Sequence, residues 1–99
     1  MFSILYAEGV VNDLSRIRKF ERTKILDQID QQLQQQPAAE NRNRKLLPGL
    51  RPPWEQELPV WELRVGEWRV FYDVDVAQCI VTVRAIRHKP PHATTEEIL

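Results

Sequence analysis

Two arginines are placed where the chain could hold a phosphate group. Arg64 and Arg69 flank a short segment, residues 65–68, that contains Gly66. Glycine at the first position of a two-residue loop is typical of a type II′ hairpin turn, and such a turn places Arg64 directly opposite Arg69. Like charges at that position destabilise a sheet. Something should therefore offset the repulsion, and a bound polyanion would do so.

A simpler source of counter-charge stays open. Glu62, Glu67 and Asp73 are close to the two arginines in sequence, and most exposed charge pairs are only solvated. The pair alone does not decide between a polyanion site and an ordinary charged sheet face.

Two further segments carry cations and no acid. The 14 basic and 14 acidic residues cancel, but segregated charge can steer a polyanion despite a neutral total. The second segment also holds two histidines, whose ordinary pKa suits acid–base chemistry near neutrality. The cations are Arg42, Arg44, Lys45 and Arg51 in residues 42–51, and Arg84, Arg87 and Lys89 with His88 and His92 in residues 84–92.

Other features limit the class of protein. The 99 residues suffice for one domain, 1–99, with a modest core. No apolar run is long enough to span a membrane, and the first residues lack the pattern of a signal peptide, so we expect a cytoplasmic protein. The single cysteine, Cys79, excludes an internal disulfide and provides no metal cluster. We predict that Cys79 is a buried thiol in a strand, and that the protein uses no metal or other cofactor.

The hairpin that carries the two arginines spans residues 60–75. Apolar and polar residues alternate here with a period of two, which is typical of half-buried strands. The turn pairs Val65 with Trp68, and the pairing continues outward to Trp61 with Tyr72. Arg64 and Arg69 then lie on the opposite face from the core. The predicted core face contains Trp61, Leu63, Val65, Trp68, Val70 and Tyr72.

Two amphipathic helices precede this hairpin. A short strand over residues 2–7 is followed by helical spacing of apolar residues over 8–20 and over 21–36. Pro37 ends the second helix. Because little linker separates them, the two helices should form an antiparallel hairpin that covers one face of the sheet.

The remaining segments complete the predicted fold. Residues 37–59 contain five prolines and are predicted to be loop, with residues 45–50 packed by their leucines. A strand over 79–88 and a polar tail follow. The order β-α-α-β-β-β predicts an α+β fold, with the helical hairpin on one face of a mostly antiparallel sheet and the other face open.

Three motifs resemble the RelE/ParE superfamily of toxins from type II toxin–antitoxin systems. They are KLLPGL at 45–50, ELRVGEWRVFY at 62–72 and IRHK at 86–89. The resemblance covers most of the chain and implies a RelE-like fold. RelE-like members are metal-independent endoribonucleases that cut mRNA in the ribosomal A site, whereas ParE-like members inhibit DNA gyrase. In both branches a cognate antitoxin wraps the toxin with an extended segment that contains a helix.

The resemblance also implies roles for single residues. Arg69 matches the strand arginine that holds the scissile phosphate, and Lys89 matches a basic residue near the end of the last strand. The catalytic candidates are therefore Arg69, Lys89, His88, His92 and Glu62. The RNA-binding candidates are Arg64, Arg84, Arg87, Lys45 and Arg44.

This chain departs from the family pattern at two positions. Glu62 stands where some members have a lysine, so it either acts as a base or weakens phosphate binding. Members often have a tyrosine after the basic pair, whereas this chain has Pro90, Pro91 and His92. His92 can stack and transfer protons, but it can equally be a solvated loop residue. Trp54, in the proline-rich loop, is predicted to be free to contact a ligand or an antitoxin.

Three functions therefore stay open. The first is a ribosome-dependent endoribonuclease. The second is a ParE-like gyrase inhibitor without catalysis. The third is a degenerate toxin that only binds its antitoxin.

Overall fold

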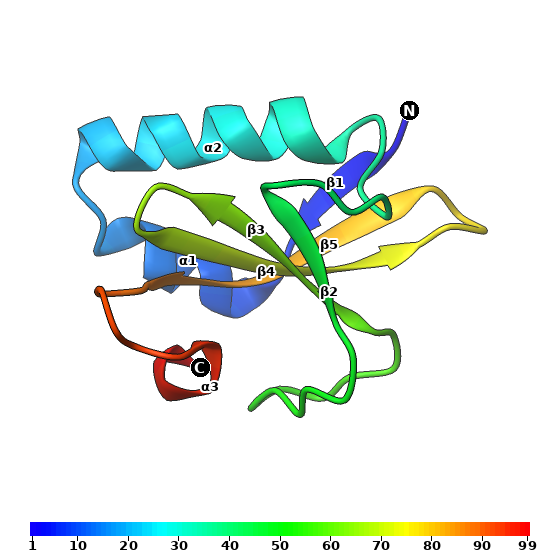
Figure 1. The fold of residues 1–99 in the computed structure, drawn as a ribbon. Coiled ribbons are helices and arrows are strands. Elements are labelled where there is room, and N and C mark those ends of the chain that lie inside the picture. Colours follow the sequence, from blue (N-terminus) through cyan, green and yellow to red (C-terminus); the bar gives the residue numbers. More distant parts are fainter.

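The hairpin of residues 60–75 forms the centre of a five-stranded sheet, with strand order β1-β5-β4-β3-β2 (Figure 1). The computed structural model describes residues 1–99. The elements are β1 (Ser3–Tyr6), α1 (Glu8–Ser15), α2 (Lys19–Leu33), β2 (Arg44–Leu47), β3 (Val60–Val65), β4 (Trp68–Asp75), β5 (Ile80–His88) and α3 (Thr95–Ile98). Only β1 and β5 pair in parallel; the other pairs are antiparallel. The predicted α+β class and the mostly antiparallel sheet are confirmed.

The predicted register of the central hairpin is also confirmed. Val65 pairs with Trp68, Arg64 with Arg69, and Trp61 with Tyr72. Gly66 has φ +58° in the turn, a conformation that glycine adopts at no steric cost. A slip of one residue would have moved every side chain to the other face, so this register decides which face carries the arginines.

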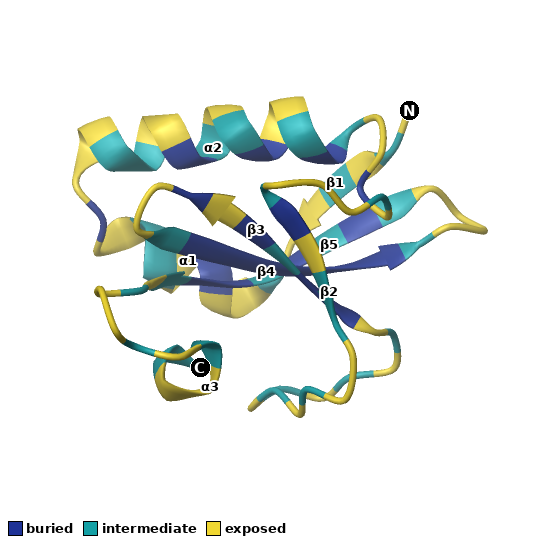
Figure 2. Cartoon of the chain, in the orientation of Figure 1, coloured by how far each residue is buried: buried dark blue, intermediate teal, exposed yellow.

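The main core lies between this sheet and the first two helices, as the buried segments of α2 and the central strands show (Figure 2). Ile25, Ile29 and Leu33 recur along one side of α2 and are fully buried, which is the spacing of an amphipathic helix. The hydroxyl of Tyr72 donates a hydrogen bond of 2.8 Å to the carbonyl oxygen of Pro37. Five of the six predicted core-face residues are buried, and Trp68 packs partly buried against the same cluster.

The helices are shorter than the sequence predicts. α1 ends at Ser15 rather than near residue 20, and α2 begins at Lys19 and ends at Leu33. Ile17, in the link between them, is buried in the main core. The apolar periodicity therefore ran across the link, because a buried loop residue contributes to the same pattern as a helical one.

Two local predictions were wrong. Residues 44–47 form an edge strand paired with β3 rather than a loop. Their side chains alternate between the two faces of the sheet, so Arg44 lies beside Leu63 and Leu46 beside Trp61. Cys79 is exposed, in the β4–β5 turn, with φ +56°. The strand begins one residue later, at Ile80.

The second face of the sheet is not open along its whole length. Val60, Phe71 and Ala85 form a small buried cluster there. Five partly buried side chains cover it: Leu47, Leu50, Trp54, Ile98 and Leu99. The predicted polar tail thus contributes the short helix α3, which lies below the sheet in Figure 1. No helix of the chain is both long and apolar enough to cross a membrane.

Trp54 does not project freely from its loop. Its ring centroid lies 6.4 Å from that of Phe71, and its buried indole Nε1 has no hydrogen-bond partner. The prediction of a free aromatic contact residue is therefore wrong, because the proline-rich loop folds back over the second face of the sheet.

Candidate functional site

A row of three arginines crosses the second face of the sheet. Arg64 on β3 pairs with Arg69 on β4, and Arg69 pairs in turn with Arg87 on β5. Side chains at paired positions lie on the same face, so the three cations occupy one line across three strands. We call this set the arginine row.

Arg69, the central member, is much less accessible than predicted. It is only 8% exposed, whereas Arg64 is exposed. The Nη1 of Arg69 donates hydrogen bonds of 2.9 Å to the carbonyl oxygens of Gly66 and Trp68. These bonds hold the guanidinium in one position beside the hairpin turn.

Glu62 is the counter-charge closest to Arg69. Its Oε1 lies 3.8 Å from Arg69 Nε. Burial lowers the pKa of Arg69; Glu62 opposes this shift, and Arg64 adds to it. A guanidinium starts from so high a pKa that it stays charged near neutrality. An anion bound beside Arg69 would therefore offset both the cost of burying the Arg69 charge and its repulsion from Arg64.

The other carboxylate oxygen of Glu62 connects the site to α3. The Thr95 hydroxyl donates a hydrogen bond of 3.0 Å to Glu62 Oε2. The helix is fixed by a capping box, in which Thr94 Oγ1 accepts from the backbone N–H of Glu97 and the Glu97 carboxylate accepts from the backbone N–H of Thr94. Residues 94–99 thus cover one side of the arginine row.

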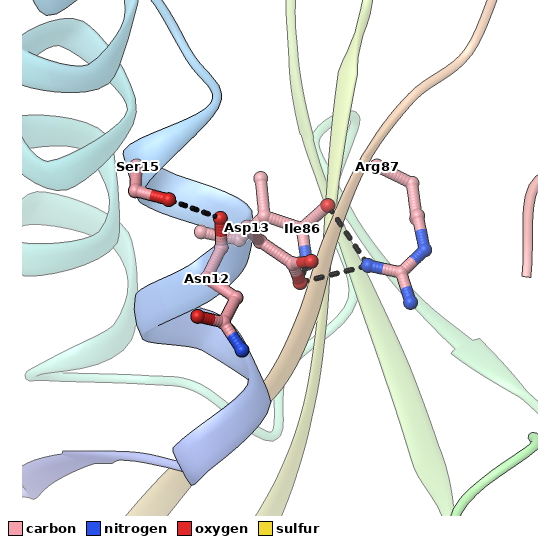
Figure 3. Close-up of polar contacts among 5 residues, drawn as sticks. All are labelled: Asn12, Asp13, Ser15, Ile86 and Arg87. Carbon is pink, nitrogen blue, oxygen red and sulfur yellow. Dashed lines mark hydrogen bonds and ion pairs between the residues drawn. The ribbon is translucent and has the colours of Figure 1, made fainter.

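Arg87 reaches around the edge of the sheet to α1 (Figure 3). Its Nη1 donates to Asp13 Oδ2 at 2.7 Å and to the carbonyl oxygen of Ile86 at 3.1 Å. The same Asp13 oxygen accepts the backbone N–H of Ile86 at 3.1 Å. Because β1 ends at Tyr6, this stretch of β5 has no neighbouring strand, and the Asp13 carboxylate takes the place of one.

The predicted histidines are not grouped with the arginine row. His88 pairs with Trp68, so it lies on the same face as that residue, opposite to Arg69. Its Nε2 is 3.0 Å from Glu67 Oε2. Its ring packs edge-on against the ring of Trp68, with the two ring centroids 5.2 Å apart. His92 is exposed in the following loop, with φ +72°.

The remaining cationic candidates are divided between the two faces. Lys45 pairs with Glu62 and is exposed, so it lies next to the arginine row. The backbone N–H of Lys89 donates to the carbonyl oxygen of Glu67, which holds Lys89 near the hairpin turn. Arg84 is engaged by Asp73, with Nε and Oδ2 2.8 Å apart.

Arg44 is on the helix side and serves the fold. Its Nη1 donates to the side chain and the carbonyl oxygen of Gln32 at 2.7 and 3.0 Å, and its Nε donates to the carbonyl oxygen of Ala39 at 2.8 Å. With 8% exposure, its guanidinium ties β2 to the end of α2. The structure therefore does not bring Arg44 to the arginine row.

The sequence did not reveal two parts of this site. The place of Arg87 in the row depends on the register of β5, which shifts between Phe71 and Tyr72, and the turn between β4 and β5 does not reveal that shift. Thr95 was overlooked, although the spacing Thr94-x-x-Glu97 is the signature of a helix start. No group of three or more His, Cys, Asp and Glu side chains is arranged to hold a metal ion.

The arrangement of two helices on one face of a mostly antiparallel sheet is shared with solved structures of RelE toxins. The chain superposes on RelE in the archaeal RelE–RelB complex from Pyrococcus horikoshii OT3 with a TM-score of 0.71 and 19% identity, over 91% of this chain and 97% of that one. For isolated RelE from E. coli the TM-score is 0.69 and the identity 14%, over 91% of this chain and 86% of that one. For the RelBE2 complex from Mycobacterium tuberculosis the TM-score is 0.67 and the identity 18%, over 89% of this chain and 98% of that one.

Sequence comparison places the chain within this class. The family model described as the ParE toxin of the type II toxin–antitoxin system parDE matches residues 4–89. The chain therefore belongs to the ParE toxin family, within the RelE/ParE superfamily. Comparison with curated protein sequences gives no significant match.

Proposed function

We propose that this toxin is a metal-independent endoribonuclease that cuts mRNA on the ribosome and so inhibits translation. The observation that carries the proposal is the arginine row, in which Arg64, Arg69 and Arg87 are in register on one face. Cations on three neighbouring strands of one face concentrate positive charge, which attracts a polyanion more strongly than a single neutralised ion pair would.

The chemistry assigns a role to each neighbour. In RNA cleavage the 2′-hydroxyl attacks the adjacent phosphorus, so a base must take its proton and cations must stabilise the charge that develops. Arg69 is the phosphate ligand, with the exposed Arg64 beside it, whereas the guanidinium of Arg87 is paired with Asp13. Glu62, 3.8 Å from Arg69, is the candidate base.

The acid that protonates the leaving 5′-oxygen comes from the segment after β5. Lys89 is held near the hairpin turn by its backbone, and His92 is exposed beyond it. His88 is the weaker candidate, because its ring lies beside Trp68 on the other face and pairs with Glu67. Positioning of the mRNA by the ribosome would supply much of the remaining rate enhancement.

The second candidate function is inhibition of DNA gyrase without catalysis. Two observations favour it. The matching family model is that of ParE, and one carboxylate oxygen of Glu62, the candidate base, is occupied by the Thr95 hydroxyl. A degenerate toxin that only binds its antitoxin remains the third candidate.

The proposed partner in each case is a cognate antitoxin. The solved relatives from P. horikoshii and M. tuberculosis are complexes of a toxin with its antitoxin. In this chain the outer faces of α1 and α2 are exposed, and β1 and β2 are the edges of the sheet. An antitoxin could add a strand to an edge and lay a helix against the helical pair.

One experiment separates the three candidates. Purified toxin is added to a reconstituted translation system, and mRNA cleavage is mapped by primer extension; in parallel, gyrase is assayed for trapped cleavage complexes. The ribonuclease proposal expects cuts only when ribosomes are present, and none with Arg69→Gln. Gyrase trapping without mRNA cuts would establish the second candidate. Neither activity, together with tight antitoxin binding, would establish the third.

A further inference from the structure

A second cationic surface lies at the junction of α1 and α2, on the helix side of the sheet. Residues 16–24 contain five cations and one acid, Glu21. We call the five cations the basic corner: Arg16, Arg18, Lys19, Arg22 and Lys24. All but Arg22 are exposed. None of the five takes part in any of the four ion pairs of the protein.

The single acid of this segment does not neutralise it. Glu21 Oε2 accepts a hydrogen bond of 2.8 Å from the indole Nε1 of Trp68, so the carboxylate is turned toward the sheet. Arg22 is the one partly buried cation, and its Nη1 donates to the carbonyl oxygen of Leu14 at 3.4 Å. The other cations face solvent.

Arg16 and the guanidinium of Arg22 lie at the C-terminal end of α1, where cations are favourable, but the cations at the start of α2 are not explained by stability. Arg18 is the N-cap residue of α2 and makes no side-chain cap, and Lys19 begins the helix. Cations at a helix N-terminus oppose the helix dipole and cost the fold some stability. A pattern that weakens the helix and leaves the cations unpaired indicates a surface kept for binding.

An exposed aromatic ring stands among these cations. Phe20 is 83% exposed. The surface around it is otherwise polar, and is lined by Lys19, Thr23, Lys24, Asp27, Gln28 and Gln31. Phe20 is the one apolar residue among those that line this part of the surface, whereas a protein partner usually buries a larger apolar core. A nucleic acid needs one aromatic face for a base to stack on and cations for its phosphates.

The basic corner also adjoins the arginine row. A Cβ placed on Gly66 would lie 3.9 Å from Lys24 Nζ, so this ammonium group lies over the hairpin turn. The carbonyl oxygen of Gly66 is an acceptor for Arg69. A hollow of about 300 Å³ lies between α2 and the turn. It is lined by Phe20, Lys24, Gly66 and Trp68, together with the acids Glu21 and Glu67 and the apolar residues Ile25 and Val65.

We propose that the basic corner binds RNA, with Lys19 and Lys24 on backbone phosphates and Phe20 stacked on an unpaired base. The RNA continues past the Gly66 turn onto the arginine row. The inference rests on the proposed ribonuclease function for the choice of RNA as the polyanion. It adds a second contact surface, on the helices, that positions RNA relative to the cleavage site.

The test measures binding of a fluorescein-labelled single-stranded RNA by fluorescence anisotropy, from about 50 mM to about 200 mM salt. The variants are the double variant Lys19→Gln, Lys24→Gln and the single variant Phe20→Ala. The matched control is Arg42→Gln, Arg51→Gln, which removes two exposed cations elsewhere. Circular dichroism verifies that each variant is folded, and Lys24→Arg tests whether charge alone restores binding.

The lysine variant and the Phe20 variant should weaken RNA binding in different ways. Loss of two phosphate contacts should reduce the slope of log affinity against log salt by about 1.4, because each contact on a single strand contributes roughly 0.7. Phe20→Ala should weaken binding roughly 5-fold to 150-fold and leave the slope unchanged. The Arg42, Arg51 control should match the wild type.

Two outcomes would overturn the inference. Corner variants that bind RNA as the control does would remove the surface from RNA recognition. Corner variants that keep RNA binding but lose the antitoxin would assign the surface to a protein partner. The assay uses neither ribosomes nor cleavage, so absence of ribonuclease activity would refute the proposed function without deciding this test.

Discussion

Thr95 and Glu62 are joined by a hydrogen bond of 3.0 Å between the threonine hydroxyl and Oε2 of the carboxylate. The opposite oxygen of Glu62 lies 3.8 Å from Arg69. One carboxylate therefore connects the C-terminal helix to the centre of the arginine row.

Removal of this link should loosen α3. Thr95→Ala loses one hydrogen bond, which costs about 1 kcal/mol of local stability. Backbone amides of residues 95–99 should then exchange faster with deuterium, while those of α2 stay unchanged. Thr23→Ala is the control, since Thr23 is exposed on α2. Equal exchange in the two variants would show that the Thr95 bond does not hold the helix.

Arg69→Gln should reduce mRNA cleavage about a hundredfold or more, by analogy with the loss of a group that stabilises developing charge. The substitution also removes the two bonds to the Gly66 and Trp68 carbonyl oxygens, so the free energy of unfolding should fall by about 2 kcal/mol. This corrects the expectation of a side chain that projects freely. Cleavage per folded molecule is the quantity to measure.

Arg51→Gln, in an exposed loop, is the control for that experiment. It should leave both cleavage and stability unchanged. A folded Arg69→Gln protein that cuts mRNA at the wild-type rate would remove Arg69 from catalysis.

Asp13→Ala should destabilise the protein more than most surface changes. It leaves the Ile86 backbone N–H and the Arg87 guanidinium without their acceptor, and loss of a charge-assisted bond costs about 1.5–3 kcal/mol. Asp13→Asn keeps an acceptor and should cost less. Urea unfolding followed by tryptophan fluorescence measures both. Equal stability of Asp13→Ala and wild type would contradict the role given to this carboxylate.

The protein should lose stability at alkaline pH. Burial raises the pKa of Tyr72, only partly offset by Arg44, and burial with Asp30 raises the pKa of Tyr6. The folded state thus keeps protons that the unfolded state releases above about pH 10. The stabilisation is complete below that pH and is lost as pH rises through the folded-state pKa values, by about 1.4 kcal/mol per pH unit for the buried Tyr72 and by less for the partly exposed Tyr6.

Tyr72→Phe isolates one of these groups. It removes the bond to Pro37, which costs about 1 kcal/mol, but it should reduce the alkaline slope. Urea unfolding below and above about pH 10 gives that slope. An unchanged slope would show that Tyr72 titrates normally in the folded protein.

The predictable part of this fold is the part fixed by local geometry. Gly66 allows a tight turn, the turn fixes the register, and the register places Arg64 opposite Arg69. Alternation over residues 60–75 then assigns the core face. Each step uses neighbours along the chain, so the sequence alone was enough.

The features that the sequence missed depend on segments distant along the chain. The burial of Arg69 requires its position against the rest of the fold, and the covering of Phe71 requires Trp54 and α3 to fold over the second face. Arg44 was grouped with Lys45 by charge, yet alternation along β2 sends it to the other face, against Gln32. A count of cations does not distinguish a guanidinium that binds a ligand from one that supports a helix.

The parallel pairing of β1 with β5 has a consequence for how this protein is made. Ser3 lies beside Ile80 and Tyr6 beside Val83, so the first strand has no partner until almost the whole chain has left the ribosome. Arg87, the last member of the arginine row, emerges later still. Contacts so distant in sequence slow folding. The nascent chain therefore cannot assemble its cationic face until residue 87 has emerged from the ribosome.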